Sequence, residues 1–86
     1  MDKEFKISRE VVKVDFANGY YLFKLGKLLN DKEISLNKFS RDTATSFATI
    51  RKHANGEVVQ LDLEVIDKWC KYLDVEDIEI YEYIRK

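Results

Sequence analysis

Few residues of this 86-residue chain combine the types and the spacing that catalysis requires. The single histidine, His53, has no second histidine with which to share a metal ion, and the single cysteine, Cys70, has no disulfide partner. Glu64 and Asp67 fall on what should be a solvated helix face. The sequence therefore predicts no enzymatic activity, no metal or other cofactor and no small-molecule substrate.

The cationic side chains are unevenly distributed, and their chemistry suits a polyanion. Residues 1–56 contain 11 Lys and Arg against 7 Asp and Glu, whereas residues 57–86 contain 4 against 9. A polyanion would be attracted to the first part of the chain and repelled by the second. The alternative is that both excesses are ordinary solvated surface without a ligand.

Two short helices are predicted to position these cations between Ser35 and Gly56. Ser35 and Ser46 are candidate N-caps, because a serine hydroxyl can accept a hydrogen bond from a free amide of the first helical turn. The second helix is predicted over residues 47–54, closed by Asn55-Gly56. Two helices joined by so tight a turn must cross steeply, which is the helix-turn-helix geometry.

This arrangement resembles the Xre/Cro family of helix-turn-helix regulators, the lambda-repressor-like DNA-binding domains. Ser35-Leu36 resembles the opening of the family's positioning helix, Ile50 its buried residue on the recognition helix, and Asn55-Gly56 its closing pair. The resemblance continues through Leu61 to Val75, which is similar to the family's fourth helix, and it covers residues 22–84.

The resemblance implies a sequence-specific transcription regulator of bacterial or phage type, such as a repressor, that binds double-stranded DNA as a homodimer. It would read the major groove with the helix from about Ser46 to Ala54. The family register places base contacts at Ser46, Phe47, Ala48, Thr49 and Lys52. The phosphate contacts are placed at Ser35, Lys38, Arg41, Arg51 and Asn55.

Departures from the family pattern keep a second interpretation open. Ala44 stands in the turn where the family generally has glycine, at a cost of about 1 kcal/mol. Phe47 and Ala48 are apolar at positions expected to read bases, and the end of the chain is acidic. The alternative function is a protein-interaction module on a helix-turn-helix fold, such as a phage-encoded inhibitor or antirepressor.

A β-hairpin is predicted before the helices. Val12, Val14 and Phe16 alternate with polar residues, and Asn18-Gly19 favours a tight turn into a second strand over residues 20–23. The competing interpretation is one helix over residues 20–30. The hairpin is expected to cover the glycine of the first helix, Gly26, and to offer its edge to a second copy of the chain.

Three further helices complete the predicted fold, over residues 24–32, from the Asp62 N-cap through Leu73, and over residues 76–84. The inward-facing residues of the last two are expected to be Leu63, Ile66, Trp69, Cys70, Leu73, Ile78, Ile80 or Tyr81, and Ile84. The predicted fold is mainly α, a five-helix lambda-repressor-like bundle over residues 24–86 with an N-terminal β-hairpin arm over residues 1–23, forming one structural unit. The charged N-terminus and the absence of any long apolar run predict a cytoplasmic protein without a membrane segment.

Overall fold

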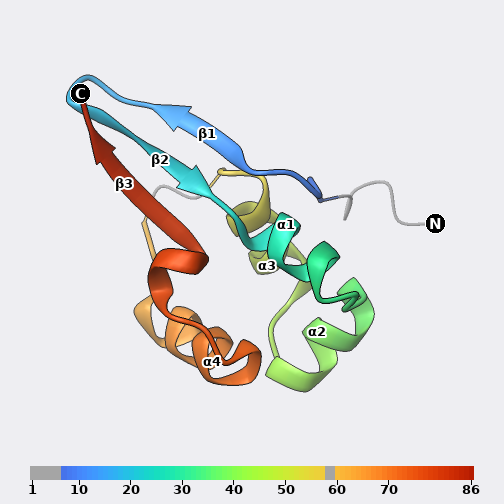
Figure 1. Cartoon of the computed structure of the whole chain (residues 1–86). Coiled ribbons are helices and arrows are strands. Elements are labelled where there is room, and N and C mark those ends of the chain that lie inside the picture. The colour runs from blue at the N-terminus through green and yellow to red at the C-terminus, as the bar shows by residue number, and fades with distance from the viewer. Residues whose placement is uncertain (1–6, 58–59) are drawn as a thin grey trace.

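Capping residues and turn signals fix most of the secondary structure in the computed structural model, which describes residues 7–57 and 60–86 (Figure 1). In chain order the elements are β1 (Val12–Asp15), β2 (Gly19–Phe23), α1 (Leu25–Asp31), α2 (Leu36–Thr43), α3 (Phe47–Ala54), α4 (Leu63–Leu73), the 3₁₀ turn η2 (Asp77–Glu79) and β3 (Tyr81–Arg85). The Asp62 carboxylate caps α4 by accepting hydrogen bonds from the amides of Glu64 (3.1 Å) and Val65 (3.3 Å).

The predicted hairpin is confirmed, and the alternative of a single helix over residues 20–30 is wrong. β1 and β2 pair antiparallel, with Val14 opposite Tyr21, and the amide of Phe16 donates to the carbonyl of Gly19 at 2.8 Å. β2 also pairs antiparallel with β3, with Tyr21 opposite Tyr83, so the strand order is β1-β2-β3. Figure 1 shows the sheet extending from the helices, with the end of β3 beside the β1–β2 turn.

The predicted fifth helix is wrong, because residues 76–84 form η2 and most of β3. Aromatic and β-branched residues such as Tyr81, Tyr83 and Ile84 suit a strand when another strand is available to pair with. β2 supplies that strand, and just beyond it the amide of Lys24 donates to the carbonyl of Ile80 at 2.7 Å. The described part of the chain therefore has four α-helices and one three-stranded sheet.

The core lies among the helices and is centred on Trp69, which is fully buried. Its ring centroid lies 5.4 Å from that of Phe39 on α2 and 4.9 Å from that of His53 on α3. The other largest fully buried side chains are Leu25, Leu29, Ile50 and Ile80. Two expected core residues are exposed, since Leu63 is 71% exposed and Ile78 is 53% exposed; Cys70 and Ile84 are half-buried.

Gly26 on α1 packs closely against a neighbouring segment, as predicted, but that segment is not the hairpin. A Cβ at Gly26 would collide with the carbonyl group of Ser8, so the chain before β1 crosses α1 at this point. The hairpin residues Val12 and Val14 instead lie next to Gly56, which ends α3 with a φ of +71°. The sheet is thereby packed against the C-terminal end of α3.

The Gly26 contact predicts an inversion of the usual effect of alanine in a helix. Replacing a helical glycine with alanine normally stabilises a protein by about 1 kcal/mol. Gly26→Ala should instead lower the free energy of unfolding by about 1–3 kcal/mol, because backbone atoms of Ser8 must move. Urea denaturation followed by circular dichroism measures the change. Lys27→Ala, at the exposed neighbouring position, is the control, and a stabilised Gly26→Ala variant would contradict the contact.

Candidate nucleic-acid interface

Serine side chains begin both helices of the helix-turn-helix unit. The hydroxyl of Ser35 accepts a hydrogen bond from the amide of Lys38 at 3.1 Å, which caps α2. The hydroxyl of Ser46 accepts from the amide of Thr49 at 3.2 Å and donates to its hydroxyl at 3.0 Å, which caps α3. Both predicted caps are confirmed, and each leaves a helix N-terminus with its partial positive charge at an exposed serine.

The turn between α2 and α3 is held by buried hydroxyl groups. Ala44 adopts the left-handed conformation (φ 52°, ψ 44°), which costs an alanine about 1 kcal/mol relative to glycine. On either side of it, the hydroxyls of Thr43 and Thr45 lie 2.9 Å apart. Thr43 donates to the carbonyl of Phe39 at 2.7 Å, and Thr45 accepts from the Trp69 indole N–H at 3.3 Å. Sequence reasoning missed this role of the two threonines, although their positions flanking the turn residue were the available signal.

The predicted base-contacting residues lie at the start and on the outer side of α3. Ile50, His53 and Ala54 are the buried residues of this helix. Of the predicted set, Ser46, Ala48 and Lys52 are exposed, whereas Phe47 and Thr49 are half-buried. The side chain of Lys52 makes no hydrogen bond or ion pair within the described residues, so its ammonium group is available to a ligand.

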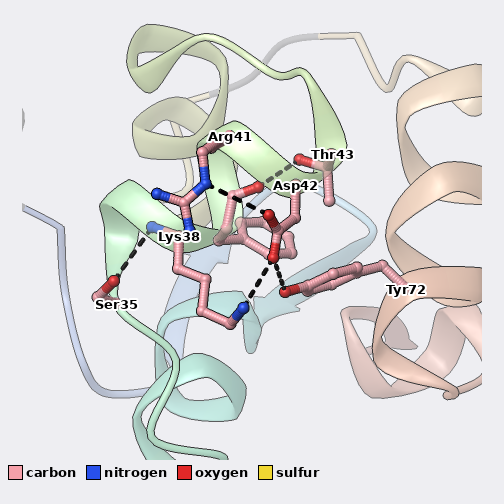
Figure 2. A network of polar contacts seen from close by, with 7 residues as sticks. Ser35, Lys38, Arg41, Asp42, Thr43 and Tyr72 are labelled. Atoms are coloured by element: carbon pink, nitrogen blue, oxygen red, sulfur yellow. Dashed lines mark hydrogen bonds and ion pairs between the residues drawn. The ribbon is translucent and has the colours of Figure 1, made fainter.

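The two predicted phosphate-binding cations of α2 are paired with a carboxylate, Asp42. The Lys38 ammonium lies 3.0 Å from Asp42 Oδ2, and Arg41 Nε lies 3.5 Å from Asp42 Oδ1. From α4, the hydroxyl of Tyr72 donates to Asp42 Oδ2 at 2.6 Å. Figure 2 shows the Lys38 and Tyr72 side chains converging on this carboxylate. Sequence reasoning missed Asp42 and Tyr72, although the spacing of Lys38 and Asp42 is that of a helical ion pair.

These contacts shift the pKa values of Asp42, Lys38 and Tyr72. The hydrogen bond from Tyr72, followed by that from Lys38, lowers the pKa of Asp42 below its ordinary value. The same contacts raise the pKa of Lys38 and of Tyr72, each chiefly through its hydrogen bond to Asp42. At neutral pH the cluster therefore consists of a carboxylate, an ammonium and a neutral phenol.

Two further predicted phosphate contacts have partners within the chain. Arg51 is half-buried, and its Nη2 lies 4.0 Å from Glu57 Oε1. The amide oxygen of Asn55 accepts a hydrogen bond from the backbone N–H of Ser8 at 2.7 Å. Both side chains tie α3 to neighbouring segments. A phosphate contact by either one stays a prediction.

His53, the one histidine, belongs to the core. Its side chain is 4% exposed, its ring lies edge-on to that of Trp69, and its Nδ1 lies 2.8 Å from the carbonyl oxygen of Thr49, to which Nδ1–H donates. Over residues 7–57 and 60–86 no cluster of three or more potential metal ligands is found. None of the helices in that part of the chain is both long and apolar enough to span a membrane.

Two short helices joined by a tight turn, the second of which has an exposed N-terminal end and a buried face, are the features of a helix-turn-helix DNA-binding domain. The sequence model of the Cro/C1-type HTH DNA-binding domain matches residues 24–86. The chain belongs to this family and is a DNA-binding regulator. No curated protein and no solved structure gave a significant match.

The contact between Tyr72 and Asp42 predicts a measurable change in acid titration. In Tyr72→Phe the pKa of Asp42 should rise, because the lowering hydrogen bond is lost. Asp42, with its folded-state pKa depressed, contributes stability above its unfolded pKa of about 4, and this contribution disappears as the pH falls through the folded pKa. The free energy of unfolding should therefore be higher for the wild type than for Tyr72→Phe at neutral pH, and this difference should become smaller in strong acid.

NMR titration of the side-chain carboxyl carbon of Asp42 measures the shift directly. Tyr81→Phe is the matched control, since Tyr81 makes no contact with Asp42 among the hydrogen bonds described. An unchanged Asp42 titration in Tyr72→Phe would show that the hydrogen bond is not formed in solution.

Proposed function

We propose that this protein regulates transcription by binding a specific double-stranded DNA sequence as a dimer, with the first half of α3 in the major groove. The observation that supports this is the division of α3 into a core face and an exposed start. Ile50 is buried in the core and His53 packs against Trp69, while Ala48 and Lys52 face outward beside the Ser46 cap. A helix held in this way can present side chains to base edges in a fixed register.

The exposed residues of α3 allow a limited set of base contacts. The unpaired ammonium of Lys52 can donate to O6 and N7 of guanine. Ala48 and Phe47 can make apolar contact with thymine methyl groups, and the hydroxyls of Ser46 and Thr49 can hydrogen-bond to bases or phosphates. Such a surface favours a site that combines one guanine contact with A·T pairs in each half.

The phosphate contacts come from the helix N-termini and from α2. Amides at the start of α2 and α3 can approach the backbone with favourable dipoles. Lys38 and Arg41 lie close by, and on binding they exchange their ion pairs with Asp42 for phosphate oxygens. Because the side chains of Lys38 and Arg41 are 54% and 71% exposed, and Asp42 keeps its hydrogen bond from Tyr72, that exchange costs little. This mechanism makes affinity strongly dependent on salt.

Selection from random duplex DNA tests the proposal. A specific dimeric reader should enrich a short two-fold-symmetric sequence, with half-sites about 34–36 Å apart for adjacent major grooves. The enriched duplex should bind at salt concentrations at which random duplexes are released. Uniform weak binding that disappears at moderate salt would contradict the proposal.

Two single substitutions separate base contacts from phosphate contacts. Lys52→Ala should weaken the selected site by roughly 1–3 kcal/mol and relax the preference at one base position. Arg41→Ala should weaken all sequences similarly and reduce the slope of log affinity against log salt by about one. Mobility-shift titrations over a range of salt concentrations provide both quantities. If both variants lost the same affinity for random duplex DNA, Lys52 would be shown to contact a phosphate group instead of a base.

A second candidate function, the protein-interaction module, is favoured by exposed apolar residues away from α3. Leu63 at the start of α4 is 71% exposed, and Ile78 in η2 is 53% exposed. Leu63 borders a groove of about 310 Å³ that also contains Asp67, Glu76 and Asp77, a surface suited to a cationic partner. Pull-downs with and without nuclease separate the candidates, because a direct protein partner stays bound after DNA is destroyed.

A further inference from the structure

At the edge of the sheet formed by β1, no described strand pairs with the backbone groups of Lys13 and Asp15. In an antiparallel pair, successive residues alternate between facing the neighbouring strand and facing away from it. The hydrogen bond from the amide of Phe16 to the carbonyl of Gly19 fixes this alternation, so that Val12, Val14 and Phe16 direct their backbone groups toward β2. Lys13 and Asp15 must therefore direct their N–H and C=O groups outward, and no strand of residues 7–57 and 60–86 pairs with them.

We propose that β1 pairs antiparallel with β1 of a second copy of this chain, with Val14 of each copy on the two-fold axis. This inference rests on the proposed action as a dimer and assigns its interface. The pairing would join two three-stranded sheets into one continuous six-stranded sheet.

The charges of β1 select this register among those that the backbone allows. With the axis at Val14, Lys13 lies opposite Asp15 of the second copy, and Asp15 lies opposite its Lys13. An axis at Lys13 would oppose two ammonium groups, and an axis at Asp15 would oppose two carboxylates, both of which are destabilising. An axis between two residues would place a residue whose N–H and C=O groups point outward opposite one whose groups point toward β2, so the hydrogen bonds could not form. It would also place side chains of opposite faces of the sheet across from each other.

The apolar side chains agree with the same register. It places Val12 opposite Phe16 of the second copy, on the face that carries Val14 and Tyr21. Phe16 is 53% exposed, and its ring packs against that of Tyr21 in a T-shaped arrangement with centroids 6.0 Å apart. Pairing would cover this exposed ring with a valine. Asp15 is free to turn toward its new partner, because its ion pair with Lys86 is exposed and 3.6 Å long.

The opposite edge of the sheet, formed by β3, is less suited to the same role. Glu82 in this strand is already bonded within the chain, with its carboxylate 2.7 Å from the ammonium of Lys24. The side chains of Glu82 and Lys24 are 32% and 27% exposed, so this pair is better protected than the pair formed by Asp15. A dimer in which β3 of each copy pairs with the other is the alternative that the charge-reversal experiment can detect.

Charge reversal tests the register through two complementary variants. Lys13→Asp places carboxylates opposite one another in the dimer, and Asp15→Lys places ammonium groups opposite one another. Each variant alone should dimerise roughly tenfold or more weakly than the wild type, which is expected to sediment as a dimer. An equimolar mixture should regain the dimer as a heterodimer, because the aspartate introduced at position 13 of one chain faces the lysine introduced at position 15 of the other. Sedimentation equilibrium measures all four samples.

Arg85→Glu on β3 is the matched control, because it reverses an exposed charge on the opposite edge and should leave the dimer intact. Circular dichroism verifies that each variant is folded. Dissociation by Arg85→Glu but not by Lys13→Asp would overturn the proposal in favour of β3. A wild-type chain that is monomeric at every concentration, or a mixture that fails to recover the dimer, would also overturn it.

The outcome is separable from that of the proposed function. If DNA selection enriches a symmetric site while charge reversal on β1 has no effect on the dimer, this interface is wrong and the DNA-binding proposal stands. If charge reversal behaves as expected while no sequence is enriched, the interface stands and specific DNA reading is wrong.

Discussion

The packing of Trp69 is the constraint on which the helix-turn-helix unit depends. Its ring contacts Phe39 on α2 and His53 on α3, and its indole N–H donates to Thr45 in the turn between them. One side chain of α4 thus fixes both helices and their connection. The eight-residue helix α3 is too short to be stable alone, so its orientation must come from such tertiary contacts.

The sheet gives this small domain a second packed region and joins distant parts of the sequence. β3 follows the last helix, yet it pairs with β2 near the start of the chain. Val12 and Val14 on β1 pack next to Gly56, just after the end of α3. The sheet therefore supports the same helix that Trp69 contacts through His53. For a chain of this size, where a single core supplies limited stability, such additional burial is significant.

In the basic first part of the chain, some cationic side chains form ion pairs with carboxylates and others do not. Asp42 neutralises much of the field of Lys38 and Arg41 on α2 and is itself fixed by Tyr72 of α4. Lys52 on α3 has no such partner among the described residues. The count of cations in the sequence therefore overstates the number that are unpaired, and the geometry shows that Lys52 is free of the ion pairs that engage Lys38 and Arg41.

The sequence by itself determined the helix-turn-helix unit, because its signals are local. The caps at Ser35 and Ser46 act on amides three residues away, so residue order is sufficient to predict them. Only the tertiary structure decided that residues 81–85 form a strand, since the pattern of aromatic and β-branched residues is compatible with either state until β2 is placed beside it. The same holds for the site: Tyr72 reaches Asp42, and Asn55 holds Ser8, only because the fold brings together residues that are distant in the chain.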